Sequence, residues 1–172
     1  MIYQVFSFDG TQSLIARGGQ AVGYQGRKKA KTSNMLVLTD SQGIPLACSE
    51  AISGEHNDAY QLEEFVENMF ESLRSSNIAT DWLLNADAGF DIESCAFCYR
   101  NDIIDNIDKN KRNGSERNTF FDSLLYKCRF VVENDQCLAD AFKAILIRFE
   151  TNKIHWKALN ILAFCVILLR QL

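Results

Sequence analysis

Several features that mark special classes of protein are missing from this sequence. Its 172 residues include one proline, which excludes collagen-like and proline-rich architectures. The longest apolar run, residues 161–169, has about half the length needed to cross a bilayer, so no transmembrane helix is expected. The first residues lack the basic start and apolar stretch of a signal peptide. These absences predict a cytoplasmic protein with no membrane partner.

The cysteines and the overall composition point to an ordinary globular domain. The six cysteines follow no disulfide-framework spacing, so they are expected to be reduced and mostly buried. The chain is 47% hydrophobic and 23% charged, which excludes a disordered polymer. A chain of this length can build one sizeable core. The sequence therefore predicts a single domain over residues 1–172.

Acidic residues are absent between Gly10 and Thr39, although the whole chain has a net charge of −4. Five basic residues fall in that interval: Arg17, Arg27, Lys28, Lys29 and Lys31. The remainder of the chain has 13 basic and 22 acidic residues, a balance of −9. A protein with one basic edge can hold a polyanion locally. The alternative is that residues 27–29 form a solvated turn.

Apolar and β-branched residues predict strands in the first part of the chain. A short strand is expected at Tyr3–Phe8, ending where Gly10 marks a break. The glycines within 18–26 predict a loop. Two apolar runs, 35–38 and 44–47, flank a five-residue turn and are expected to form a β-hairpin.

Helical periodicity dominates the rest of the chain. Residues 58–74 place apolar side chains at helical spacing and glutamates on the opposite face. The apolar run 81–86 predicts a buried strand that ends in a turn. Further elements are a short helix at 92–99, a strand at 103–107, and helices at 119–126, 130–149 and 154–169. This order predicts an α/β fold, with a mixed sheet flanked by helices.

Three carboxylates fall at expected junctions between elements. Asp9 ends the first strand, Asp87 follows the strand at 81–86, and Glu133 lies early in a long helix. In open α/β sheets, ligands collect beyond the carboxyl ends of the strands. Two aspartates and a glutamate there would form an oxygen-rich cage for a hard cation such as Mg²⁺. The alternative is chance, because 22 acidic residues will place some at strand ends.

Short motifs surround these carboxylates and the basic cluster. They are Asp-Gly-Thr at 9–11, Gly-Arg-Lys-Lys-Ala-Lys-Thr-Ser-Asn at 26–34, Asn-Ala-Asp-Ala-Gly-Phe-Asp at 85–91, Arg-Phe-Val-Val-Glu at 129–133 and Phe-Lys-Ala-Ile-Leu-Ile-Arg-Phe-Glu at 142–150. In their order and spacing they resemble the DDE transposases of bacterial insertion sequences, most closely the IS4/IS5-like group. The resemblance spans nearly the whole chain, and it rests on the joint order of the motifs.

The resemblance implies an RNase H-like fold in which Asp9, Asp87 and Glu133 are the catalytic, metal-binding residues. Enzymes of this kind use two divalent cations, about 3.5–4 Å apart, for in-line attack on phosphorus. The implied activity is DNA cleavage at insertion-sequence ends, followed by transfer of the freed 3′-hydroxyl to target DNA. Mg²⁺ is the expected cofactor, and Mn²⁺ is expected to substitute for it. The implied partners are double-stranded DNA and further copies of the chain.

Six basic residues are expected to contact DNA phosphates without reading the base sequence: Arg27, Lys28, Lys29, Lys31, Lys143 and Arg148. Lys143 and Arg148 follow Glu133 in the chain and are expected on the same helix, in one helical sector. For Arg148 the alternative is a salt bridge to a neighbouring acid.

Two features depart from the family's pattern. The chain begins eight residues before Asp9, so the N-terminal DNA-binding region usual in the family is expected to be absent. An upstream-frame protein that supplies it is therefore an expected partner. Asn134 and Leu138 stand where the family commonly has arginine and tryptophan, which puts a DNA contact or helix support in doubt.

Two other functions stay open. The chain could be a catalytically silent fragment that binds DNA or partner transposase and regulates transposition. It could also be an RNase H-like nuclease of another kind that uses the same carboxylates. The silent fragment would bind DNA without cutting it, whereas the other nuclease would cut DNA without strand transfer.

Overall fold

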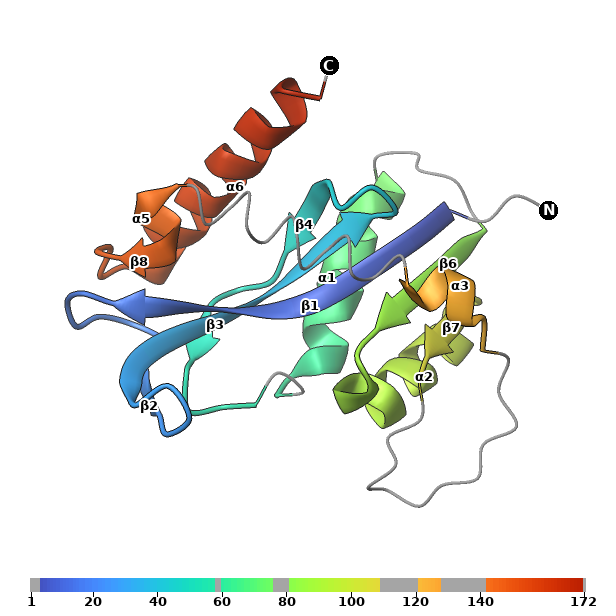
Figure 1. Cartoon of the computed structure of the whole chain (residues 1–172), viewed down its shortest axis with the longest axis horizontal. Coiled ribbons are helices and arrows are strands. Elements are labelled where there is room, and N and C mark those ends of the chain that lie inside the picture. The colour runs from blue at the N-terminus through green and yellow to red at the C-terminus, as the bar shows by residue number, and fades with distance from the viewer. Residues whose placement is uncertain (1–3, 58–59, 76–80, 109–120, 128–141, 172) are drawn as a thin grey trace.

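Two long antiparallel strands form the centre of the sheet (Figure 1). Strand β1 spans Gln4–Ile15, strand β3 spans Ala30–Asp40, and they pair over nine consecutive positions. The computed structural model describes residues 4–57, 60–75, 81–108, 121–127 and 142–171.

Strand β1 runs through Gly10, so the predicted break at that residue is wrong. Gly10 pairs with Leu36 of β3, and the pairing continues as far as Leu14. A glycine weakens a strand interior by only about 0.5–1 kcal/mol. The backbone hydrogen bonds of the successive pairs outweigh that cost, and β1 therefore continues to Ile15.

Three short strands pair with the other edge of β3: β2 (Gly23–Gln25), β4 (Pro45–Cys48) and β5 (Ile52–Ser53). Strand β2 lies within the glycine-rich stretch 18–26, so the predicted loop is wrong at Gly23–Gln25. The predicted hairpin is confirmed as β3 followed by β4. Its turn uses Gly43 at a φ of 83°, a conformation that favours glycine, and the Gly43 N–H donates to the Asp40 carbonyl at 3.1 Å.

On the other side of β1 the sheet is parallel. Strand β6 (Trp82–Ala86) pairs with β1, and β7 (Ile104–Ile107) pairs with β6. At its far end β1 also pairs with the short strand β8 (Ile147–Arg148). The described strands make one eight-stranded sheet with the central order β2-β3-β1-β6-β7. The strands predicted at 81–86 and 103–107 are confirmed.

Helices α1 (Leu62–Ser75) and α2 (Asp91–Arg100) cover one face of the sheet. In Figure 1, α1 lies behind the two long strands. The apolar side of α1 meets the sheet through contacts such as that of Phe70 with Phe6, whose ring centroids are 5.9 Å apart. The 3₁₀ turn η1 (Ala88–Phe90) joins β6 to α2. Both predicted helices are confirmed, although α1 begins later than the sequence predicted.

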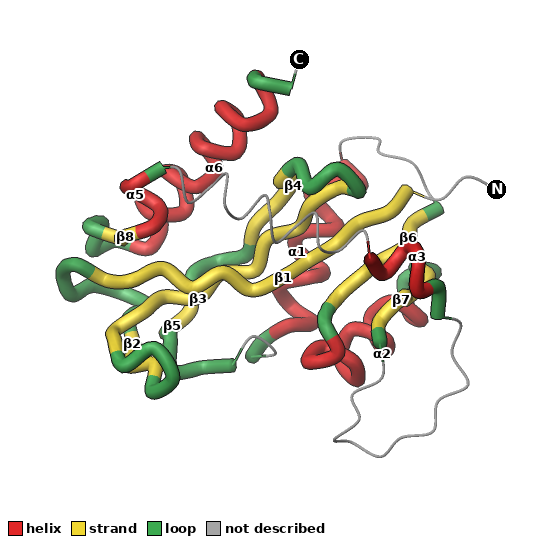
Figure 2. The backbone as a smooth tube through the Cα atoms, in the orientation of Figure 1, coloured by secondary structure: helices red, strands yellow, loops and turns green. Residues whose placement is uncertain are grey.

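The opposite face carries α3 (Ser123–Lys127), α5 (Lys143–Leu146) and α6 (Lys153–Leu169), as Figure 2 shows. The packing of α6 against β3 forms a second core cluster that includes Trp156 and Val37. The predicted helix at 154–169 is therefore confirmed. Among the described helices, none combines the length and apolar character that crossing a bilayer requires.

The helix expected over 130–149 is wrong at its C-terminal end. Helix α5 stops at Leu146, and the next two residues form β8 beside the end of β1. Residues 128–141, which include Glu133, lie outside the described part. Because Arg148 is in β8, it does not share a helix with Lys143. The pairing of β8 with β1 outweighs the local helical pattern.

The predicted fold class is confirmed. A mixed sheet lies between helices on both of its faces, with an antiparallel part around β3 followed by the parallel strands β6 and β7. This arrangement is the RNase H-like one that the motifs imply.

Candidate active site

Asp9 lies on β1, and Asp87 is the first residue after β6, the adjacent parallel strand. Strands β1 and β6 stay paired up to Ser7 opposite Asn85, and each aspartate follows two residues later. Because side chains alternate along a strand, the aspartates belong to the same face as Ser7 and Asn85. Adjacent strands lie about 5 Å apart. The fold thus brings together two of the three predicted carboxylates, and we call this part of the sheet the carboxylate edge.

The two aspartates differ in their surroundings. Asp9 is half-buried within β1, and its Oδ1 accepts a hydrogen bond from the Gly10 N–H at 2.8 Å. Asp87 is exposed at the end of β6, and its carbonyl accepts from the Phe90 N–H at 2.9 Å. One carboxylate is therefore fixed within the sheet, whereas the other stands at the rim and faces solvent.

Two buried asparagines form a polar network beside Asp87. The Nδ2 of Asn106 donates to Oδ1 of Asn85 at 2.8 Å, and both side chains have no exposed area. Asn85 donates to the Leu125 carbonyl at 3.1 Å, while Oδ1 of Asn106 accepts from the Asp122 N–H at 2.7 Å. These bonds hold α3 on the face of the carboxylate edge. This pair was not predicted, although an asparagine inside each apolar strand was a visible signal.

Glu133, the third predicted carboxylate, lies outside the described residues. The helices on either side of it can nevertheless be placed. Helix α3 is bound to Asn85 on the face of the carboxylate edge. Helix α5 lies on the same face, because its Ile145 carbonyl accepts from the Ser13 hydroxyl at 2.8 Å. The described helices that precede and follow Glu133 in the chain therefore lie on the face to which Asp9 belongs.

A further carboxylate, Asp108, follows the next strand of the sheet. Asn106 of β7 pairs with Asn85, so Asp108 stands two residues beyond that pair, as Asp87 does on β6. Asp108 was not predicted as a site residue, because its position depends on the register of β7. Among the described residues, no three histidine, cysteine, aspartate or glutamate side chains are grouped closely enough to hold a metal ion.

The basic cluster predicted to bind DNA lies at the other end of the long strands. Arg27, Lys28 and Lys29 are exposed in the turn between β2 and β3, and Lys31 is exposed at the start of β3. The Nζ of Lys28 donates to the Gln12 carbonyl at 3.3 Å. These charges are accessible to a polyanion, whether they bind one or are simply solvated. The side chain of residue 143, at the start of α5, lies outside the described part.

Arg148 is held inside the protein. Its Nε donates to the Glu150 carbonyl at 2.7 Å, Nη1 donates to the Ser33 hydroxyl at 2.6 Å, and Nη2 donates to the Thr151 carbonyl at 3.4 Å. The guanidinium also lies over the Trp156 ring, 5.1 Å from its centroid. Burial lowers the pKa of Arg148, and the negative charge of Glu150 opposes that effect. The side chain has no exposed area, so we leave Arg148 out of the DNA-contact set.

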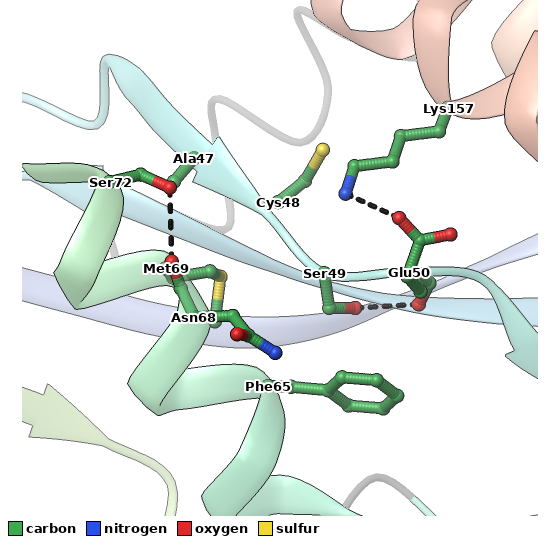
Figure 3. Close-up of a pocket in the computed structure, with 9 residues that line it drawn as sticks. All are labelled: Ala47, Cys48, Ser49, Glu50, Phe65, Asn68, Met69, Ser72 and Lys157. Carbon is green, nitrogen blue, oxygen red and sulfur yellow. Dashed lines mark hydrogen bonds and ion pairs between the residues drawn. The ribbon is translucent and has the colours of Figure 1, made fainter.

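A cavity of about 160 Å³ lies between β4, α1 and α6 (Figure 3). Lys157 and Glu50 form an ion pair of 2.7 Å in its lining, and Cys48 lies beside them. Burial, as the largest cause, raises the pKa of Cys48 to about 11, so its thiol stays protonated at neutral pH. A protonated thiol is a poor nucleophile and a poor metal ligand. None of the predicted site residues lines this cavity.

Comparisons with known proteins give one result that covers the chain. A family model described as DDE superfamily endonuclease matches residues 8–170. The matched segment includes Asp9, Asp87, Glu133 and the basic cluster. No curated protein and no solved structure matches the chain.

Proposed function

The chain belongs to the DDE superfamily of endonucleases, and on that premise we propose that it is a DDE transposase of the IS4/IS5-like kind. It cuts DNA strands at insertion-sequence ends and transfers the freed 3′-hydroxyl to target DNA. Its partners in this proposal are double-stranded DNA and further copies of itself, and it works in the cytoplasm.

The main support is the parallel register of β1 and β6, because Asp9 and Asp87 each stand two residues beyond the Ser7–Asn85 pair. Further support comes from α3 and α5, which lie on the face of the carboxylate edge and flank Glu133 in the chain. We therefore propose Asp9, Asp87 and Glu133 as the catalytic carboxylates.

Endonucleases of this family use divalent metal ions, and the donors at the carboxylate edge fit such ions. Asp9 and Asp87 offer carboxylate oxygens, the hard ligands that Mg²⁺ prefers. We propose that these two residues and Glu133 hold Mg²⁺, with Mn²⁺ able to replace it. When bound, the cations stabilise charge on the attacking and leaving oxygens at phosphorus.

The residues of the chain supply fixed geometry and charge. The backbone of Asp9 is positioned by the pairing of β1 with β3, and its carboxylate accepts the hydrogen bond from the Gly10 N–H. The Asn85–Asn106 pair fixes the backbone next to Asp87. Arg27, Lys28, Lys29 and Lys31 contact phosphates and orient the duplex without reading its sequence; Lys143 is proposed for the same role.

Nicking of supercoiled plasmid in Mg²⁺ or Mn²⁺ tests this proposal, with Asp87→Asn and Asp81→Asn as matched variants. Asp81 and Asp87 flank opposite ends of β6, and both are exposed, so each variant removes one exposed charge. We expect Asp87→Asn to slow nicking about a thousandfold, because several kcal/mol of transition-state stabilisation are lost. Asp81→Asn should nick at the rate of the unmodified chain. Equal rates for both variants would contradict the proposed site.

A joining assay separates transposition from the other two functions. A labelled oligonucleotide with a free 3′-hydroxyl is mixed with target plasmid and the metal ion, and covalent transfer of the label is measured. Transfer that is lost in Glu133→Gln supports the transposase. Nicking without transfer indicates an RNase H-like nuclease of another kind, and duplex binding without any nicking indicates a silent regulator.

A further inference from the structure

Strands β1 and β3 connect the carboxylate edge to the basic cluster and fix the distance between them. Asp9 pairs with Val37 of β3, whereas Lys31 lies six residues further along the same strand. A strand rises about 3.3 Å per residue, so Lys31 stands roughly 20 Å from Asp9 along the sheet. Because the two positions lie on one continuous pair of strands, this separation is built into the fold.

Two basic residues from distant parts of the chain lie at the same end as the β2–β3 turn. Arg17 is exposed in the loop after β1, and that loop is tied to the start of α6. The Gln20 N–H donates to the Thr151 carbonyl at 2.9 Å, and Oε1 of Gln20 accepts from the Lys153 N–H at 3.3 Å. The loop and the start of α6 therefore form one surface.

We call this surface the basic end. It consists of Arg17, Arg27, Lys28, Lys29, Lys31 and Lys153. Two acidic residues lie close by: Glu55 is beside Gly23 of β2, and the Glu150 carbonyl binds Arg148. The six cations still outnumber these two acids, so the surface carries an excess of positive charge that fits a polyanion.

An exposed aromatic side chain adds a second kind of contact. Tyr24 of β2 pairs with Lys31, and 59% of its surface is exposed. Tyrosine hydroxyls donate to phosphate and sugar oxygens in protein–DNA complexes. Tyr24 can therefore add a hydrogen bond to the nucleic acid backbone beside the charge contacts of the lysines.

We propose that the basic end, with Arg17 and Lys153 as members, holds the DNA duplex about six base pairs from the phosphate that is cut. This inference rests on the proposed function, because it takes the carboxylate edge as the cutting site. The distance follows from the strand length, since roughly 20 Å corresponds to six steps of 3.4 Å along a duplex strand. The basic end is thus a second DNA-binding surface, which positions the duplex over the carboxylates.

Salt-dependent binding tests the membership of Arg17 and Lys153. The full chain is titrated with a duplex of about 30 base pairs in EDTA, which keeps cutting out of the measurement. Each phosphate contact contributes about 0.9 to the slope of log affinity against log salt. We expect Arg17→Gln/Lys153→Gln to reduce that slope by about 1.8.

The matched control is Arg74→Gln/Arg100→Gln, which removes the same charge from the face that carries α1 and α2. Arg74 donates to Asn101, and Arg100 pairs with Glu63, so both already have partners there. The control should keep the slope of the unmodified chain. Equal slopes for the two double variants, or no duplex binding by the unmodified chain, would overturn the inference.

The distance is tested by mapping nicks along a labelled linear duplex. If the basic end must hold DNA, nicks should stop about six base pairs short of one duplex end, and Arg17→Gln/Lys153→Gln should relax that limit. If the unmodified chain cuts up to both ends of the duplex, the proposed distance of six base pairs is wrong. The proposed function and the proposed DNA contact at the basic end fail separately. If Arg17→Gln/Lys153→Gln lowers the salt slope but the unmodified chain does not nick DNA, the proposed function is wrong. If the unmodified chain nicks DNA but the double variant keeps its salt slope, the DNA contact of Arg17 and Lys153 is wrong.

Discussion

The carboxylate edge and the basic end lie on the same pair of strands but are built in different ways. Beside the carboxylate edge, Asn85 and Asn106 are fully buried, and their hydrogen bonds hold a helix against the sheet. At the basic end, the side chains of Lys29 and Lys31 are exposed on a short turn and the strand that follows it. The difference reflects what each region must do. A catalytic carboxylate needs a fixed position, whereas a phosphate contact needs mainly charge and reach.

Arg148 is an exception to this difference. It is a cation near the basic end, but it is buried and hydrogen-bonded like the asparagines beside the carboxylate edge. We expect Arg148→Met to lower the free energy of unfolding by about 3–5 kcal/mol, since two short charge-assisted hydrogen bonds disappear and leave buried acceptors unpaired. Chemical denaturation measures the loss. The matched variant Arg100→Met removes an exposed cation paired with Glu63 and should change stability by no more than about 0.5 kcal/mol. If Arg148→Met cost as little, the structural role of Arg148 would be wrong.

Asn106→Leu tests whether the buried network supports the carboxylate edge. We expect a loss of about 3 kcal/mol in unfolding free energy, because Asn85 and the Asp122 backbone lose their partners without access to water. Nicking should fall as well in the fraction that remains folded, since α3 is no longer held beside Asp87. Asn68→Leu, on the exposed side of α1, is the control for both measurements. Normal stability in Asn106→Leu would mean that the network does not hold this face.

The residues that line the Cys48 cavity belong to neither region. The pH dependence of stability and the activity of a Cys48 variant test whether the cavity is independent of the active site. Burial raises the pKa of Cys48 from 9.0 to about 11, so the unfolded chain releases this proton at lower pH than the folded chain. Stability from this group is therefore full below pH 9 and falls as pH rises toward 11, by at most about 2.7 kcal/mol. Denaturation curves at several pH values should show a shallower decline in Cys48→Ala. Its nicking rate at neutral pH should equal that of the unmodified chain, and a slower rate would link the cavity to the active site.

Lys29→Gly should give the smallest effect on stability. Lys29 has a φ of 50°, a left-handed conformation that glycine adopts more easily. We expect the free energy of unfolding to stay equal or rise by up to about 1 kcal/mol, while the salt slope of duplex binding falls by about 0.9. The variant thus distinguishes the contribution of the Lys29 charge to DNA binding from its contribution to stability. A clear loss of stability would show that the lysine side chain supports the turn.

Local sequence patterns were sufficient for elements whose partners are near in the chain. The amphipathic spacing in α1 requires one apolar face, and the apolar run of β6 requires burial, so both were predictable. The hairpin of β3 and β4 followed from two apolar runs and the glycine of their turn. Predictions failed where a distant strand decided the outcome. β1 continues through Gly10 because β3 pairs with it, and the helix expected to reach residue 149 stops at Leu146 because β8 pairs with β1.

The sequence by itself determined which side chains were available: aspartates beside apolar strand segments, a basic cluster without nearby acids, and the motif order of a DDE endonuclease. Only the tertiary structure decided which of them meet. Asp9 and Asp87 become neighbours through the parallel register of β1 and β6, and Arg17 joins Lys153 through the bonds of Gln20. Arg148, a DNA contact by its motif, is instead buried as a support. The reason is physical: side-chain chemistry is a local property, whereas proximity and burial depend on pairings between residues far apart in the chain.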